Sequence, residues 1–192
     1  MDGRRLDDQQ IIARARAGDG VAFSQLVLQH QDLAFRIAYL ILGDAAEAED
    51  AAQEAFLKAY DALGRFRPDA PFRPWLLEIV ANQARNHRRA VGRRAHMALR
   101  AAVASLSGET SSSPEAAALD QEQRRELLEA VDGLRDQERL AVTGRYFLDL
   151  SEAELAAVLG CPRGTVKSRV SRALARLRER LAEHPDVDAM HG

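Results

Sequence analysis

Apolar residues recur through this chain at spacings of three, four and seven, the period of an α-helix with one buried face. The clearest run comprises Phe23, Leu26, Val27, Leu33, Ile37, Leu40 and Ile41. Gly18 and Gly43 are placed to end such helices, and Asp44 with Glu47 three residues later forms a capping pair that starts another. No stretch alternates convincingly at the period of two that a strand needs. The sequence therefore predicts an all-α fold.

A polar segment divides the chain. Residues 105–114 read SLSGETSSSP and contain almost nothing that builds a core, which is typical of a linker. We expect two small helical domains joined by a flexible linker. The predicted ranges are residues 1–95 for the first domain, 96–115 for the linker, 116–183 for the second domain and 184–192 for a tail.

Composition excludes several classes of protein. Cys161 is the single cysteine among 192 residues, and the five histidines show no metal-binding spacing, so we expect neither a disulfide nor a metal site. No apolar run approaches the roughly 18 residues of a membrane span, and the N-terminus lacks a signal peptide. No nucleophile or phosphate-loop arrangement indicates an enzyme, and no cofactor is expected. The sequence predicts a cytoplasmic protein that is not an enzyme.

The charges are segregated although the net charge is only -2. No acid occurs in residues 79–108, whereas residues 163–180 hold seven bases and one acid, Glu179. Two basic segments in an otherwise acidic chain indicate two contacts with a polyanion. The alternative is that both segments are solvated helix faces. The basic residues of the first segment are Arg85, Arg88, Arg89, Arg93, Arg94 and Arg100.

The second basic segment has the pattern of a helix-turn-helix. Ser151 and Glu154 form a capping box, Gly160 ends that helix, and Pro162 precedes a second helix that we expect to reach Leu181. On a helical wheel, one stripe is apolar: Val166, Val170, Leu174, Leu177 and Leu181. The opposite face carries Lys167, Ser168, Ser171, Arg172, Ala175 and Arg178. Small and basic residues on one face suit the DNA major groove. Arg169 and Arg176 lie on the flank, where we expect phosphate contacts.

The first basic segment follows a different pattern. A helix starting near Pro71 should bury Trp75, Leu76, Ile79 and Val80, leaving Leu77, Arg85 and Arg88 exposed and placing Asn86 nearer the core. Asn82 and Arg89 fall at the margin. The nearby aromatic residues Phe66, Phe72 and Trp75 could form a platform for unstacked bases. The other interpretation is that they belong to the core.

Four ordered strings carry a resemblance to a known family. They are ARAGDGVAFSQLV, GDAAEAEDAAQEAFLKAY, FRPWLLEIVANQARNHRR and LSEAELAAVLGCPRGTVKSRVSRALARLRE. Between about Asp8 and Leu181 the chain closely resembles the extracytoplasmic-function (ECF) sigma factors of the sigma-70 family. The resemblance implies a sigma factor that binds core RNA polymerase and recognises the minus-ten and minus-thirty-five promoter elements. It also implies that the protein helps to open the promoter.

The resemblance assigns roles to particular residues. The acidic helix matches the family's surface for the clamp helices of the polymerase β′ subunit, with residues Asp50, Gln53, Glu54 and Phe56; the β subunit is a further implied contact. The resemblance implies that a second set of residues contacts the minus-ten element: Arg65, Phe66, Arg67, Asn82, Arg85, Asn86, Arg88 and Arg89. It implies that a third set contacts the minus-thirty-five element: Arg145, Lys167, Ser168, Ser171 and Arg172. Lys167 and Ser171 stand where the envelope-stress protein has arginine and phenylalanine, so the resemblance does not carry over its exact DNA sequence preference.

The resemblance also implies a regulator. Family members usually have an anti-sigma factor, sometimes membrane-anchored, and the chain is expected to have one while being no membrane protein itself. The alternative function is a helix-turn-helix transcriptional regulator that acts without core polymerase. The string QEAF and the second basic helix argue against that alternative.

Overall fold

The structure, a computed structural model, describes residues 2–67, 69–91 and 125–182. These residues form helices and connecting turns without a strand, which confirms the all-α prediction for this part of the chain. The elements are α1 (Asp2–Arg16), α2 (Gly20–Leu42), α3 (Ala45–Ala62), η1 (Leu63–Arg65), α4 (Phe72–Val91), α7 (Asp136–Tyr146), α8 (Glu152–Leu159) and α9 (Arg163–Ala182). Residues 125–132 are also helical. The expected linker and tail lie outside the described residues.

The helix boundaries in the N-terminal half follow from capping. The Asp19 carboxylate accepts hydrogen bonds from the main-chain N–H groups of Val21 and Ala22, at 3.0 and 3.1 Å, and so caps α2. Gly43 ends α2 with a φ of 79°, a conformation that glycine adopts without a steric penalty. Asp44 then caps α3 by accepting from the N–H of Glu47 at 2.9 Å. Both breaks were predicted from the sequence.

The C-terminal half contains the predicted helix-turn-helix. Ser151 and Glu154 form a complete capping box at the start of α8, and Gly160 ends α8 with a φ of 62°. Val166 and Leu177 of α9 are buried, in agreement with the predicted apolar stripe. Leu181 departs from it, because this last turn of α9 extends beyond α7 and α8 and leaves the side chain exposed. The turn chemistry and the wheel together therefore placed the two helices correctly.

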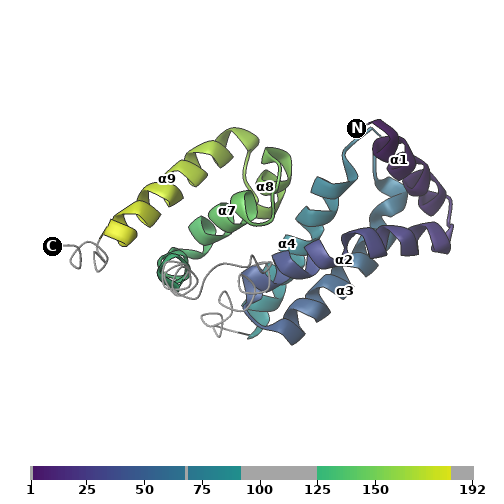
Figure 1. The fold of residues 1–192 in the computed structure, drawn as a ribbon. Coiled ribbons are helices and arrows are strands. Elements are labelled where there is room, and N and C mark those ends of the chain that lie inside the picture. The colour runs from purple at the N-terminus through teal and green to yellow at the C-terminus, as the bar shows by residue number, and fades with distance from the viewer. Residues whose placement is uncertain (1, 68, 92–124, 183–192) are drawn as a thin grey trace, which may run out of the picture.

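The two halves of the molecule are packed against each other. α8 lies on α4, and buried residues from both halves belong to one apolar cluster (Figure 1). This packing corrects the expectation that Leu77 is exposed: Leu77 is 0% exposed, because the face of α4 that a helical wheel leaves to solvent is covered by α8. Leu155, Ala156 and Val158 supply the apolar residues of α8 to the shared cluster.

Candidate nucleic-acid interface

The exposed face of α9 carries the predicted DNA-contacting residues. Lys167, Ser168, Ser171 and Arg172 are all exposed. Ser168 Oγ donates to the main-chain oxygen of Thr165 at 2.9 Å, and Arg172 Nε donates to that of Ser168 at 3.2 Å. These bonds stay within the helix, so the face presents short polar groups and two cations to solvent. Such a face can enter a major groove and reach base edges or phosphates.

The flank of α9 contacts α7 in this structure, and its predicted phosphate contacts stay a prediction. Arg169 donates to Gln137 at 2.8 Å, and Arg176 pairs with Glu138 at 2.5 Å. Both partners lie on α7, so these arginines hold α9 against α7. The expected phosphate contacts of Arg169 and Arg176 are therefore replaced by contacts within the C-terminal half in this structure.

A groove of about 320 Å³ adjoins the exposed face of α9. Among the residues that line it are Arg145, Tyr146, Glu152, Lys167, Ser171 and Arg178. Arg145 is exposed and donates to the main-chain oxygen of Leu150 at 3.0 Å, which braces the turn between α7 and α8. Tyr146 is 59% exposed and was missed by the sequence analysis. Its place beside Arg145, at the end of a helix, was the available signal.

Some of the predicted DNA-contacting residues of the basic helix α4 are exposed, and others contact the rest of the protein. Asn82, Asn86 and Arg89 are exposed, whereas Arg85 and Arg88 are half-buried. The exposure of Asn86 corrects its predicted position near the core. The wheel angle of Asn86 is close to the apolar stripe, but α3 meets α4 at Gln83 and His87 and leaves Asn86 exposed. Arg89 Nη1 lies 3.4 Å from Asn86 Oδ1 in a long hydrogen bond.

The half-buried arginines of α4 contact the C-terminal half. Arg85 donates to the main-chain oxygen of Val158 and, at 3.0 Å, to Asn82 Oδ1. Arg88 forms an ion pair with Asp136 at 2.8 Å. Burial, together with the charges of Arg88 and Arg89, lowers the pKa of Arg85 from its usual range. Two predicted DNA contacts are thus occupied by protein groups in this structure.

The aromatic residues near the start of α4 form a buried cluster. Phe66 is 4% exposed, and its ring centroid lies 4.8 Å from that of Trp75 and 5.7 Å from that of Phe72. Of the two interpretations left open by the sequence, this structure shows core packing for Phe66 and Phe72, which are buried, whereas Trp75 is half-buried against them. Arg65 and Arg67 on either side are exposed, and Arg67 pairs with Asp69 at 2.9 Å.

The predicted polymerase surface lies on α3. Asp50, Gln53 and Glu54 are exposed, as that prediction requires. Phe56 is 8% exposed and packs into the core with the alanines on the inner face of α3, so it presents no ring to a partner in this structure. Its place two residues after Glu54 turns it to the opposite side of the helix.

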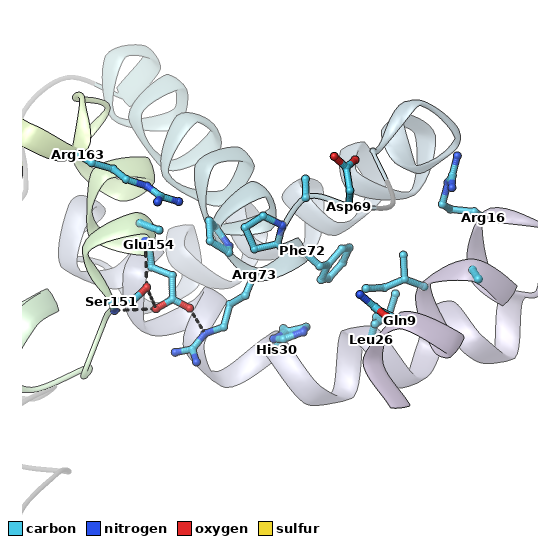
Figure 2. A pocket seen from close by; sticks show the side chains of 16 residues that line it. Gln9, Arg16, Leu26, His30, Asp69, Phe72, Arg73, Ser151, Glu154 and Arg163 are labelled. Atoms are coloured by element: carbon cyan, nitrogen blue, oxygen red, sulfur yellow. Dashed lines mark hydrogen bonds and ion pairs between the residues drawn. The ribbon is translucent and has the colours of Figure 1, made fainter. Parts of the chain in front are cut away.

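A larger groove of about 890 Å³ separates the start of α4 from α8 (Figure 2). Arg73 crosses it and forms an ion pair with Glu154 at 2.8 Å, while Glu154 also closes the capping box with Ser151. The remaining wall is formed by α1 and α2, including Leu26 and His30. This ion pair is a third polar contact between the two halves.

The described ranges contain no group of three or more His, Cys, Asp or Glu side chains that could hold a metal ion. Cys161 is a free thiol. None of the helices described is both long and apolar enough to cross a membrane.

Comparisons with known proteins identify the family of the chain. Sigma-70 region 2 matches residues 26–94, and Sigma-70 region 4 matches residues 124–177. The chain is 41% identical to the RNA polymerase sigma-H factor of Pseudomonas aeruginosa over 172 residues, covering 86% of this chain and 89% of that protein. It is 37% identical to the ECF RNA polymerase sigma-E factor of Escherichia coli over 177 residues, covering 88% and 91%.

Two solved structures also match this chain. The structure of CnrH in complex with the cytosolic domain of CnrY matches with a TM-score of 0.65 and 28% identity, covering 92% of this chain and 98% of that one. The sigma factor RpoE in complex with the anti-sigma factor NepR from Bartonella quintana matches with a TM-score of 0.57 and 25% identity, covering 83% and 96%.

A helix-turn-helix beside a basic helix is typical of a DNA-binding protein. The chain belongs to the extracytoplasmic-function group of the sigma-70 family of RNA polymerase sigma factors. The alternative of a regulator that acts without polymerase finds no support in these comparisons.

Proposed function

We propose that this sigma factor binds core RNA polymerase through α3, reads the minus-ten element with α4 and reads the minus-thirty-five element with α9. The observation that carries the proposal is the exposed face of α9, where Lys167, Ser171 and Arg172 project from a helix-turn-helix. The protein acts by binding and without covalent chemistry, in the cytoplasm with its polymerase.

Separate surfaces for DNA and for polymerase suit this function. The exposed acids Asp50 and Glu54 on α3 would repel DNA and attract a basic protein surface such as the β′ clamp helices. Asn82, Asn86 and Arg89 are exposed on α4, where an amide can read a base edge of an opened strand and a cation can hold the backbone.

The polymerase surface is tested by charge reversal. Asp50→Lys with Glu54→Lys should abolish co-elution of the chain with core polymerase in gel filtration while helical content remains unchanged. Reversal of Asp32, an exposed acid of α2, serves as the control and should leave co-elution intact. Co-elution of the double variant at unchanged affinity would contradict the proposal.

Promoter binding should separate the two halves of the chain. The promoter elements are centred about 25 base pairs apart, or about 85 Å along B-DNA at 3.4 Å per pair. α8 and α4 are in contact here, and Arg85 is bonded to Val158. We therefore propose that the structure is a closed form and that α8 leaves α4 when both elements are bound.

We also propose an anti-sigma partner. CnrH and RpoE were solved with CnrY and NepR respectively, and the groove crossed by Arg73 offers an apolar floor between the two halves. An inhibitor that spans this groove and the acidic surface of α3 should compete with core polymerase, and the Asp50 and Glu54 reversals should weaken both complexes. A ternary complex that forms but fails to transcribe would place inhibition at DNA binding instead.

A further inference from the structure

A buried amide joins the proposed polymerase surface to the minus-ten helix. Gln83 of α4 is 5% exposed and faces α3. Its Oε1 accepts a hydrogen bond from Lys58 Nζ, and its Nε2 donates to Glu54 Oε2. One turn further along α4, His87 Nε2 lies 3.0 Å from the same Glu54 oxygen. Two residues of α4 therefore hold one carboxylate of α3.

The network fixes the charge of Glu54. The hydrogen bond from His87 is the main cause that lowers the pKa of Glu54, with further contributions from Gln83 and Lys58, whereas burial acts in the opposite direction. The carboxylate is therefore ionised at neutral pH. Its side chain remains 48% exposed, so this charge is accessible to a partner.

The network also fixes the direction of Glu54. Both bonds from α4 are made to Oε2, and Oε1 has no hydrogen-bond partner among the residues described. Asp50 and Gln53, the other exposed polar residues of the surface, make no hydrogen bond or ion pair within the same ranges. Glu54 is thus the member of the surface that is oriented before a partner arrives.

We propose that Gln83 and His87 are positioning residues for the polymerase contact: they hold the Glu54 carboxylate so that its free oxygen meets a donor on core polymerase. The inference rests on the proposed polymerase surface and adds two residues of α4 to it. Ordering a side chain on binding weakens an interface, so an oriented carboxylate improves affinity without any new contact. The expected gain is about 2- to 12-fold in Kd.

A double-mutant cycle on the full-length chain tests the inference. Gln83→Leu and His87→Leu are each made with Glu54 present and in a Glu54→Ala background, and Kd for core polymerase is measured with a fluorescent label on the chain. With Glu54 present, each change should raise Kd by about 2- to 12-fold. In the Glu54→Ala background, neither should raise it further, because a residue that acts through Glu54 loses its effect with Glu54.

Two further variants separate positioning from folding. His87→Gln keeps a donor and should retain most of the affinity, whereas Glu78→Leu, an exposed residue of the same helix, should leave Kd unchanged. Melting temperatures show whether each variant is folded. If Gln83→Leu unfolds because Gln83 is buried, the His87 variants still test the inference, since His87 is only half-buried.

The outcomes distinguish the two levels of the proposal. An unchanged Kd for Glu54→Ala would overturn the surface assignment and the inference with it. Suppose instead that Glu54→Ala raises Kd, but that His87→Leu either leaves Kd unchanged or raises it equally with and without Glu54. This result would support the surface assignment and overturn the positioning role.

Discussion

The guanidinium of Arg85 on α4 donates to the main-chain oxygen of Val158, the penultimate residue of α8. The same guanidinium also donates to Asn82, so two residues proposed to read the minus-ten element are linked to the helix-turn-helix. Arg73 with Glu154 and Arg88 with Asp136 add two ion pairs across the same boundary. The proposed promoter contacts of Arg85 and Arg88 would therefore compete with this closed arrangement.

This competition predicts a measurable opening. Donor and acceptor dyes are placed at Leu28→Cys on α2 and Glu179→Cys on α9, two exposed positions, in a chain with Cys161→Ala. Energy transfer should be high in the free chain and low in the holoenzyme on promoter DNA. Arg73→Ala should lower the transfer in the free chain, because it removes an ion pair to the buried Glu154. Transfer that stays constant from free chain to promoter complex would refute the opening.

The α9 face should read the upstream element specifically. Lys167→Ala and Arg172→Ala should each weaken duplex promoter binding by the holoenzyme by about 1 to 3 kcal/mol, which corresponds to about 5- to 150-fold. Little should change on a premelted template without the upstream element. Glu179→Ala, exposed on the same helix, is the control. Equal losses on both templates would instead assign these residues to the fold.

The helix ends could be predicted because they depend on residues that are close in sequence. The burial of several side chains could not be predicted, because it depends on helices that are distant in sequence. The cap of Ser151 and the positive φ of Gly160 depend on neighbours in sequence, so the pattern alone located the helix-turn-helix. The burial of Leu77 depends on α8, more than 70 residues away along the chain. Likewise, Phe66 and Phe56 were themselves predicted to contact DNA and polymerase, but both side chains are buried in this structure. The residue assignments for DNA and polymerase remain predictions.

The capping box of α8 should stabilise the C-terminal half. Ser151 Oγ lies 2.7 Å from Glu154 Oε2 and accepts from the Glu154 N–H at 3.3 Å. Ser151→Ala should lower the free energy of unfolding by about 1 kcal/mol, because a helix N–H loses its partner. Ser151→Asp keeps an acceptor and should cost less, although its charge would face that of Glu154. Urea unfolding followed by circular dichroism measures both, and equal losses would argue against a capping role.

Stability should decline at acid pH partly through Asp19. Hydrogen bonds from the Ala22 N–H and from Arg14 lower the pKa of Asp19. A carboxyl whose pKa is lower in the folded than in the unfolded state contributes stability that is fully present above about pH 4. That contribution is lost as pH falls through the lowered folded-state pKa. Melting curves between about pH 7 and pH 3 should therefore fall less steeply for Asp19→Asn, which keeps a capping oxygen without the charge. An identical pH dependence in both proteins would exclude this origin.

The minus-ten helix should prefer an opened strand. The holoenzyme should bind single-stranded non-template DNA of the minus-ten region more tightly than the same sequence as a duplex, because no base has to be unpaired. Arg89 is exposed and supplies charge alone, so Arg89→Ala should weaken binding to every sequence and reduce the salt slope by about 0.7. Asn82 offers both a donor and an acceptor, so Asn82→Ala should instead reduce discrimination between correct and altered bases.

Phe66 requires a different expectation, because its ring is buried against Trp75 and Phe72. Phe66→Ala should destabilise the fold by about 3 to 5 kcal/mol, as other buried aromatic truncations do. Fluorescence anisotropy with labelled oligonucleotides measures affinity, and melting curves separate the fold from the contact. A uniform loss for Asn82→Ala across all sequences would remove its reading role. A stable Phe66→Ala variant with altered base preference would instead show that this ring leaves the core to meet DNA.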